Sequence, residues 1–322
     1  MTQSGVGGGP AAAAVDIGGT KISVAIVRPD GELSGFASRS SRDISPRDAV
    51  TWAHEELEKA AREAERGGWR VEVLGVGATG RHDQRAERLG AIDTVLPGWG
   101  GSDLPAQLAE RLSIPLGALL NDADAAAIAE GQIGAGCDAD LCAVVTIGTG
   151  IGVALLHHGR PTTGASGGHG EFGHTTIAFD GPSCMCGAAG CWESFAGGGA
   201  MERAWRDGGT SDHETGGSAL SAMEIFDLAD RGTPRADEIV SRAVRATALG
   251  IANLAVACAP EVIVIGGGLA ARWSRYAPHV SKELERRAPI MSVSPRIALA
   301  TFGSNAVLVG AGISALDTVS TP

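Results

Sequence analysis

One short pattern occurs twice in this chain of 322 residues: an apolar strand, a polar residue, an apolar residue, a turn of glycine and threonine, and a second apolar strand. The first copy is AAAAVDIGGTKISVAIV (11–27) and the second is CAVVTIGTGIGVALL (142–156). The spacing to the return strand differs by about one residue between the copies. The repeat predicts an internal duplication, with one hairpin in each of two lobes.

Strand-like and helix-like segments alternate along the rest of the chain. Helices are predicted over 46–66, 104–112, 222–258 and 304–317, and buried strands over 71–80, 114–121 and 261–266. Such alternation is typical of an α/β protein.

Three glycine clusters follow apolar strands and are suited to hold phosphate: Gly18-Gly19-Thr20, Gly148-Thr149-Gly150 and Gly266-Gly267-Gly268. Glycine lets backbone N–H groups approach a phosphate closely, and threonine adds a hydroxyl donor. Each cluster alone is weak evidence, because hairpin turns use glycine without binding anything. Asp16 lies just before the first turn and is placed to hold Mg²⁺, and Lys21 is placed to screen the charge of a phosphate. Thr146 is the counterpart of Asp16 in the second copy.

The last glycine cluster also fits a dinucleotide-binding fingerprint, Gly266-x-Gly268-x-x-Ala271. We rank that alternative low, because the acids about twenty residues further on lie in a charged helical segment rather than at the end of a strand. The sequence contains no P-loop.

Asn121 and Asp122 end an apolar run and directly precede an alanine-rich helix. Open α/β sheets bind ligands at this edge, so both side chains are candidate site residues. The alternative is a purely structural helix N-cap, a role that Asp and Asn often fill.

A histidine and three cysteines form a candidate metal site: His174, Cys184, Cys186 and Cys191. Zinc takes four nitrogen and sulfur ligands, and this segment supplies them without a distant partner. In a reducing compartment we favour metal ligation over a disulfide, and we expect the other three cysteines, Cys137, Cys142 and Cys258, to be buried thiols. Glu171 and Glu193 flank the site, so a metal would hold two carboxylates and an imidazole close together.

The formal net charge of −11 argues against nucleic acid or a membrane surface as a partner. The first residues lack the features of an export signal, and we expect a cytoplasmic protein.

The motifs DIGGTK, LPGWGG, NDADAAAIAEG, TIGTGIG, GEFGH with CMCGAAGCWE, and APEVIVIGGGL together resemble those of the ROK family of bacterial sugar kinases, including glucokinases. This family belongs to the actin and hexokinase-like ATPase superfamily. The resemblance implies a two-lobed, ribonuclease H-like α/β fold with a cleft between the lobes and a zinc-binding loop. It implies a small lobe (11–120), a large lobe (121–304) with the zinc loop (174–193), and a C-terminal helix (305–322) that returns to the small lobe. Residues 1–10 are rich in glycine and serine, and we expect them to form a disordered tail.

The resemblance also implies the roles of single residues. Asp122 matches the catalytic base, and Gly80, Asn121, Glu171, His174 and Glu193 match sugar-binding positions, so that His174 would serve both zinc and substrate. ATP with Mg²⁺ is the implied phosphate donor. The implied reaction is phosphorylation of glucose to glucose 6-phosphate, by a homodimer or homotetramer.

Four positions depart from the family's pattern: Thr79, Val95, Asp124 and His169. A polar group left unpaired in a closed site costs about 1–3 kcal/mol, so such changes favour a substrate with a different set of hydroxyls. An N-acetylhexosamine and a C7 cyclitol are therefore alternatives to glucose. Sugar-sensing regulators of the family carry a DNA-binding segment before the first strand; only about ten low-complexity residues precede it here, and we expect an enzyme.

Overall fold

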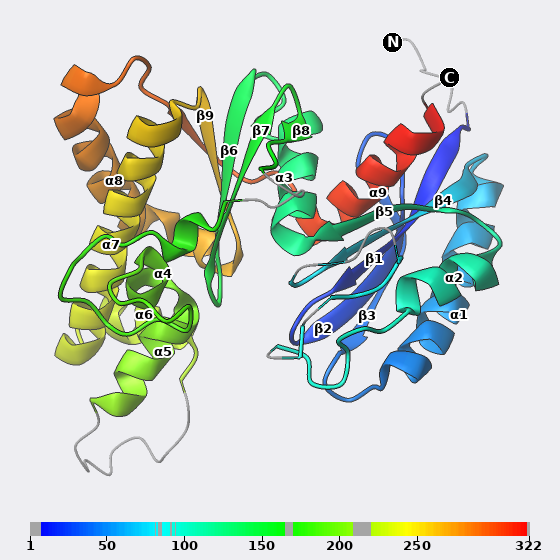
Figure 1. Ribbon diagram of the computed structural model, residues 1–322, viewed down its shortest axis with the longest axis horizontal. Helices are drawn as coiled ribbons and strands as arrows, with labels where there is room; N and C mark the ends of the chain where they lie inside the picture. Colours follow the sequence, from blue (N-terminus) through cyan, green and yellow to red (C-terminus); the bar gives the residue numbers. More distant parts are fainter. Residues whose placement is uncertain are drawn as a thin grey trace. The chain divides into compact units, whose positions relative to one another are not determined.

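A computed structural model describes residues 8–80, 82, 86–90, 92–93, 95–164, 170–208 and 220–320. The chain divides into two compact units (Figure 1). The first unit runs to Cys137 and is completed by the segment from Ser304 onward, and the second unit is Asp138–Gly303.

The first unit contains a mixed five-stranded sheet with the strand order β3-β2-β1-β4-β5. Strands β1 and β2 are antiparallel, as are β2 and β3, whereas β4 and β5 run parallel to β1. Its elements are β1 (Pro10–Ile17), β2 (Lys21–Val27), β3 (Leu33–Ser40), α1 (Pro46–Arg66), β4 (Arg70–Ala78), α2 (Leu104–Leu112), β5 (Leu116–Asn121), α3 (Asp122–Gln132) and α9 (Ala306–Ser320).

The second unit contains another five-stranded sheet, with the order β10-β9-β6-β7-β8. Its strands are β6 (Leu141–Ile147), β7 (Ile151–His157), β8 (Arg160–Pro161), β9 (Val262–Gly266) and β10 (Arg296–Leu299). Its helices are α4 (Trp192–Ala196), α5 (Gly198–Asp207), α6 (Ala222–Asp230), α7 (Pro234–Cys258) and α8 (Trp273–Arg287), with short 3₁₀ turns η2 (Phe172–His174), η3 (Gly268–Arg272) and η4 (Ala288–Ile290). A further turn, η5 (Gly303–Asn305), leads into α9.

The two sheets share one topology. In each sheet the first strand pairs with an antiparallel hairpin partner on one side and with a parallel strand on the other. This common order agrees with the duplication that the repeated hairpin predicts. Together with the flanking helices it gives the actin and hexokinase-like α/β fold expected from the sequence.

The strand registers explain the difference in spacing between the two hairpins. The pair Ile17↔Ile22 closes the first turn around residues 18–21, whereas Ile147↔Ile151 closes the second around residues 148–150. The first turn is therefore one residue longer. Asp16 and Thr146 occupy the same place, one residue before the last paired residue of their strands.

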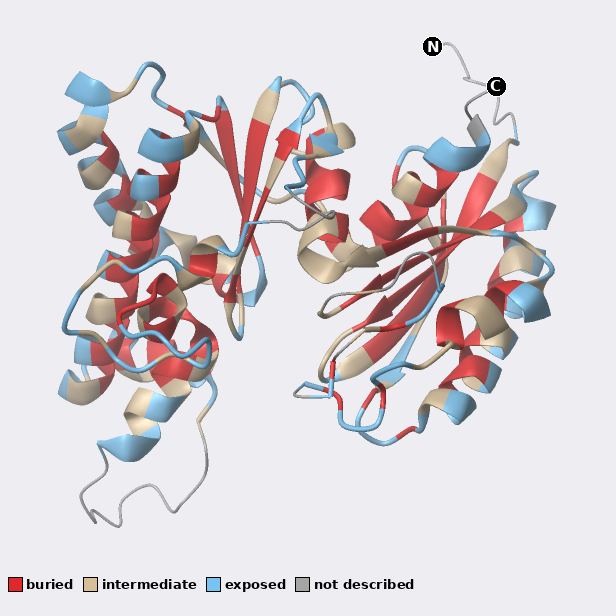
Figure 2. Ribbon diagram, in the orientation of Figure 1, coloured by how far each residue is buried: buried red, intermediate tan, exposed pale blue. Residues whose placement is uncertain are grey.

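Both sheets are buried along their central strands (Figure 2). In the first unit the core joins β1, β2 and β4 to the apolar face of α1 and to α2. In the second unit α7 supplies many of the core residues and packs against α6 and α8. Helix α7 is long and apolar enough to span a membrane, but 67% of its apolar window is buried inside the protein, as in the core helix of a globular domain.

The C-terminal helix α9 lies unusually close to its neighbours because glycines line the contact. A Cβ atom at Gly310 would stand 1.6 Å from the Ala125 carbonyl oxygen of α3. One at Gly75 in β4 would stand 2.0 Å from the Ala311 carbonyl oxygen. Backbone therefore meets backbone on both sides of α9, and this packing places α3 in the first unit.

Most predicted elements form as expected, with three differences. The division between the units falls at Cys137/Asp138 rather than at 120/121, because α3 packs on α9. The helical stretch 222–258 is two helices, interrupted by a turn at Gly232, which has a φ of 84°. Of the tail predicted to be disordered, residues 1–7 lie outside the described part of the chain, and Pro10 already belongs to β1.

Helix propensity and packing predict opposite effects of Gly310→Ala on the free energy of unfolding. Alanine is about 1 kcal/mol more favourable than glycine inside a helix. The close contact with Ala125 instead predicts that Gly310→Ala lowers the free energy of unfolding, by about 2 kcal/mol or more. Urea unfolding measures this, with Val319→Ala at an exposed position of α9 as the control. A stabilised Gly310→Ala protein would contradict the packing.

Candidate active site and metal centre

The first unit gathers several predicted site residues at one edge of its sheet. Ile17 of β1 pairs with Ala78 of β4, and Ala78 pairs with Asn121 of β5. These three strands are parallel, so their carboxyl ends meet at the edge where ligands bind to such sheets. The predicted residues at this edge are Asp16, Gly18, Gly19, Thr20, Lys21, Gly80, Asn121 and Asp122.

The helix-capping role at the start of α3 falls to Asn121, not to Asp122. Asn121 Oδ1 accepts a hydrogen bond from the Ala123 N–H at 2.8 Å, and its Nδ2 donates to the Gly80 carbonyl at 2.8 Å. Asp122 is the first helical residue, and its Oδ1 also accepts from the Ala123 N–H, at 2.9 Å. One asparagine thus fixes both the start of α3 and the backbone at Gly80.

Asp16 is an acidic side chain in an unfavourable place for a charge. It is 7% exposed, and burial raises its pKa to about 7. The Lys21 ammonium opposes this rise in pKa, and the neighbouring Asp122 carboxylate adds to it. A carboxyl that is costly to ionise, close to a second acid, is well suited to receive a cation.

The first glycine turn is held by its carbonyl oxygens. Ser41 Oγ donates to the Gly18 carbonyl at 2.8 Å, Arg42 Nε to the Gly19 carbonyl at 3.1 Å, and the Ser41 N–H to the Thr20 carbonyl at 3.1 Å. Among the described residues, the N–H groups of Gly19 and Thr20 have no acceptor. The turn therefore presents amide donors to a ligand, as a phosphate site requires.

Sequence reasoning missed Ser41, Arg42 and also His82. The His82 ring accepts from the Gly90 N–H at 3.3 Å, so its Nε2 carries the proton and donates to the Ala78 carbonyl at 2.8 Å. Burial lowers the pKa of His82, against the opposing effects of that hydrogen bond and of the nearby Asp122 charge. The neutral His82 imidazole thus fixes the chain segment that follows β4, close to Asp122. No local sequence motif predicts this role for His82.

The second unit brings the other two glycine clusters together. Thr146 of β6 pairs with Gly266 of the parallel strand β9. Gly267, with a φ of 83°, follows directly; a Cβ there would stand 2.5 Å from the Ile147 carbonyl oxygen. The turns Gly148–Gly150 and Gly266–Gly268 are therefore neighbours, and Gly267 has to be glycine for both conformation and space.

The backbone of Ile151 contacts Glu193 on one side and the turn η2, which ends at His174, on the other. Glu193 Oε2 accepts a hydrogen bond from the Ile151 N–H at 2.9 Å. On the carbonyl side, a Cβ at Gly173 would stand 2.3 Å from the Ile151 oxygen, so η2 packs directly on this residue. His174 ends η2 and Glu171 precedes it, with the His174 N–H donating to the Glu171 carbonyl at 3.0 Å.

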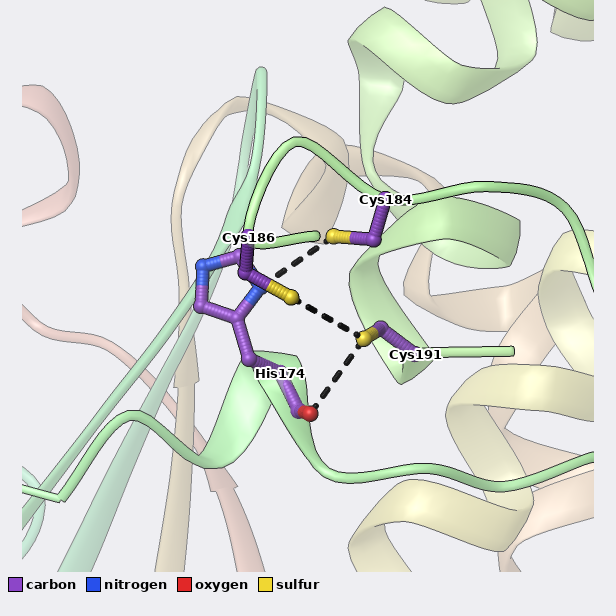
Figure 3. A group of neighbouring side chains, drawn as sticks. All are labelled: His174, Cys184, Cys186 and Cys191. Carbon is purple, nitrogen blue, oxygen red and sulfur yellow. Dashed lines mark hydrogen bonds between the residues drawn. The ribbon is translucent and has the colours of Figure 1, made fainter. Parts of the chain in front are cut away.

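The candidate metal ligands converge as predicted (Figure 3). One ligand atom from each of His174, Cys184, Cys186 and Cys191 lies within 4.8 Å of the others. His174 Nδ1 is 3.3 Å from Cys184 Sγ, and Cys186 Sγ is 3.6 Å from Cys191 Sγ. Figure 3 shows the other nitrogen of the His174 ring facing away from the sulfurs.

These distances fit a tetrahedral metal. Zinc bonds of about 2.3 Å to sulfur and about 2.0 Å to nitrogen give tetrahedron edges of about 3.8 Å between sulfurs and about 3.5 Å between nitrogen and sulfur. A sulfur pair 3.6 Å apart is far from the disulfide bond length of about 2.05 Å. Burial and the neighbouring thiols raise the pKa of Cys191 to about 12, so a bound cation would have to displace its proton.

The remaining cysteines only partly match the expectation of buried thiols. Cys142 is buried and Cys258 is half-buried, but Cys137 is exposed. Cys137 lies in the turns between α3 and β6, where an apolar-looking sequence does not have to pack in a core.

The four departures from the family's pattern have different surroundings. Thr79 lies beside Gly80 at the end of β4, and Asp124 lies in the first turn of α3. Val95 contacts the first glycine turn, since a Cβ at Gly19 would stand 2.6 Å from its Cγ1. His169 lies outside the described residues.

Comparison with known proteins gives the family. The model of the ROK family matches residues 12–318. The chain belongs to the ROK family. This confirms the resemblance seen in the motifs.

Among its relatives, the glucokinase of Thermotoga maritima is 32% identical over 262 residues, covering 79% of this chain and 81% of the relative. The N-acetylmannosamine kinase of Vibrio cholerae is 29% identical over 287 residues, an alignment that covers 87% of this chain and 91% of the relative. The structure of a ROK glucokinase from Streptomyces griseus, in complex with glucose and AMPPNP, superposes with a TM-score of 0.72 at 27% identity, covering 94% and 97% of the two chains.

The raised pKa of Asp16 predicts a conflict between stability and function. The unfolded chain ionises this carboxyl near pH 3.9, and the folded protein holds the proton until pH about 7. Between these values the folded state binds more protons, so its stability falls as the pH rises. At pH 8 without Mg²⁺, Asp16→Asn should raise the free energy of unfolding, by on the order of 4 kcal/mol at most, and the gain should shrink at pH 5.

Thermal unfolding at the two pH values measures this gain, with the exposed Glu63→Gln as a matched carboxyl-to-amide control. The same variant should lose any activity that depends on Mg²⁺. A gain that is equal at pH 5 and pH 8 would show that Asp16 is not held protonated.

The metal site predicts that Cys186→Ser removes bound zinc. Substituting one thiolate of a Cys₃His set leaves an incomplete tetrahedron, and structural zinc contributes directly to folding. Elemental analysis of the purified protein should find about one zinc per chain before the change and a small fraction of that after it. The exposed Cys137→Ser is the control, and unchanged zinc in Cys186→Ser with full activity would refute the site.

Proposed function

We propose that this protein transfers the terminal phosphoryl group of ATP to a hydroxyl of a hexose, and that the principal reaction converts glucose to glucose 6-phosphate. Two features support a kinase: membership of a family whose curated relatives are glucokinases and N-acetylmannosamine kinases, and the chemistry of the sheet edges. The single observation that carries the proposal is Asp122, a carboxylate at the first position of α3 beside the buried Asp16.

Phosphoryl transfer has a loose transition state, so the protein's task is to position the reacting groups and to neutralise charge. Asp122 would accept the proton of the sugar hydroxyl as the new P–O bond forms. The turns at Gly18–Thr20, Gly148–Gly150 and Gly266–Gly268 would donate backbone N–H groups to the phosphates, with the hydroxyls of Thr20, Thr146 and Thr149 as further donors. Asp16 would hold Mg²⁺, which neutralises phosphate charge, and Lys21 would add a second cation.

The sugar would be held by Gly80, Asn121, Glu171, His174 and Glu193. His174 Nδ1 faces the sulfurs, which leaves the other ring nitrogen for a sugar hydroxyl. Zinc, the metal that the three thiols and the imidazole suit, would fix the orientation of that ring. The metal is therefore structural in this proposal, and the reacting groups are side chains and backbone.

The second candidate substrate class is an N-acetylhexosamine, favoured by the similarity to an N-acetylmannosamine kinase. The changes at Thr79, Val95, Asp124 and His169 keep a C7 cyclitol open as well, because they alter the polar groups that the family's pattern places near the sugar. We also propose a cytoplasmic location, which suits six cysteines that are all free thiols, and assembly as a homodimer or homotetramer.

A coupled ADP-release assay with Mg-ATP tests the proposed function. The acceptors are glucose, N-acetylglucosamine, N-acetylmannosamine, mannose, fructose, allose and a C7 cyclitol. We expect turnover on glucose, and Asp122→Asn should lower kcat by about 10²–10⁴-fold, because an amide cannot accept the proton. The exposed Glu110→Gln at the end of α2 makes the same chemical change away from the site and should leave kcat unchanged.

Turnover on another acceptor but not on glucose would assign the substrate to that class. Sugar binding without turnover on any acceptor would indicate a sensor rather than a kinase. Full activity of Asp122→Asn would remove Asp122 from the role of general base.

A further inference from the structure

The metal centre and the second phosphate turn are joined by one short helix. Helix α4 begins at Trp192, directly after the metal ligand Cys191, which is its N-cap residue. One residue further on, Glu193 reaches the hairpin and accepts a hydrogen bond from the Ile151 N–H at 2.9 Å. A Cβ at Gly150 would stand 2.3 Å from the same carboxylate oxygen, so Glu193 lies directly against the turn.

Helix α5, which follows α4, also contacts the turn. The Gly198 N–H donates to the Gly148 carbonyl at 2.8 Å, and the Gly199 N–H donates to the Thr149 carbonyl at 2.9 Å. Among the described residues, the N–H groups of Thr149 and Gly150 have no acceptor. The N-terminal amides of α5 therefore hold the carbonyls of the turn, and the amides of Thr149 and Gly150 remain available to a phosphate.

The position of α4 depends in turn on the metal segment. Cys191 is fully buried, and its carbonyl accepts from Ser194 Oγ at 2.7 Å. The Trp192 N–H donates to the Thr175 carbonyl at 3.0 Å, next to the ligand His174. The Trp192 ring is buried against α7, where a Cβ at Gly250 would stand 2.2 Å from it. A cation bound to Cys191 and His174 would thus fix the N-cap of α4 and also the segment at Thr175 to which the first turn of α4 is hydrogen-bonded.

We infer that α4 couples the metal centre to the nucleotide-phosphate turn: metal bound by His174, Cys184, Cys186 and Cys191 holds Glu193 in place, and Glu193 holds Gly148–Gly150 in its phosphate-binding form. Glu193 is then a positioning residue for ATP, in addition to its proposed contact with sugar. Loss of the metal weakens nucleotide binding as well as sugar binding. This inference rests on the proposed function.

The duplicated hairpin supplies an internal control. The first turn, Gly18–Thr20, has the same arrangement, but Ser41 and Arg42 hold its carbonyls. Neither residue belongs to the metal segment. Coupling through α4 should therefore loosen only the second turn, whereas a general loss of stability should loosen both turns.

Amide hydrogen exchange of the metal-loaded and chelated full chain tests the coupling. On zinc removal we expect the Ile151 amide to exchange about 10-fold faster or more, with the Ile22 amide of the first hairpin unchanged. Calorimetry should show Kd for Mg-ADP rising by about 5-fold or more after chelation. Unchanged Ile151 exchange, or equal acceleration at Ile151 and Ile22, overturns the inference.

Two substitutions at Glu193 separate its roles without touching the metal ligands. Glu193→Gln keeps an oxygen that can accept from the Ile151 N–H, so exchange at Ile151 should stay slow and Kd for Mg-ADP should change little. Glu193→Ala removes that acceptor and should reproduce the effect of chelation on both. If Glu193→Ala leaves both measurements unchanged, Glu193 does not position the turn. If the loaded protein binds no nucleotide at all, the proposed function fails, while the exchange data still decide the coupling.

Discussion

The structure depends on a simple requirement of backbone hydrogen bonding: a turn that binds phosphate must keep its N–H groups unpaired while its carbonyl groups are satisfied elsewhere. Both hairpins meet the requirement, with different partners. In the first, a serine hydroxyl and a guanidinium that follow β3 hold the carbonyls. In the second, the N-terminal amides of α5 do so. The same strand order in both units puts each turn at the carboxyl edge of its sheet, so the duplicated topology yields two donor turns from one pattern.

The first unit also keeps a destabilising feature at this edge. Desolvation of Asp16 and its proximity to Asp122 both disfavour ionisation, and only Lys21 opposes them. An apolar residue would fill the same space without an electrostatic cost. A protein tolerates such a cost at a position where a ligand later offsets it, and a divalent cation with phosphate is a ligand of that kind. Close packing through Gly75 and Gly310 places α9 directly against the sheet that carries Asp16 and against α3.

Local sequence patterns predict the elements that depend on interactions between residues close together in the chain. The repeated hairpin, the helices α1 and α2 and the Cys₃His segment all form from neighbouring residues, and the sequence alone predicts their positions well. What it missed depends on contacts between distant segments. Ser41 and Arg42 donate hydrogen bonds to a turn more than twenty residues earlier in the chain. His82 bonds only to backbone groups, and no sequence motif marks it. Helix α3 belongs to the first unit because the C-terminal helix α9 packs on it.

The predicted sugar ligands show why specificity is hard to read from their identity alone. Asn121 uses one N–H for the Gly80 carbonyl and one lone pair of Oδ1 for the Ala123 N–H, which leaves one donor and one acceptor for substrate. Glu193 likewise gives one oxygen to Ile151. Substituting such a residue changes the backbone as well as the pocket, so these positions are poor places for evolution to adjust substrate choice. Thr79 and Val95 lie beside the same backbone groups, at Gly80 and Gly19, without being the residues that hold them. A different residue at such a position can change the shape of a neighbouring pocket while the turns and the start of α3 stay intact, so we expect these positions, rather than Asn121 or Glu193, to adjust the proposed choice of sugar.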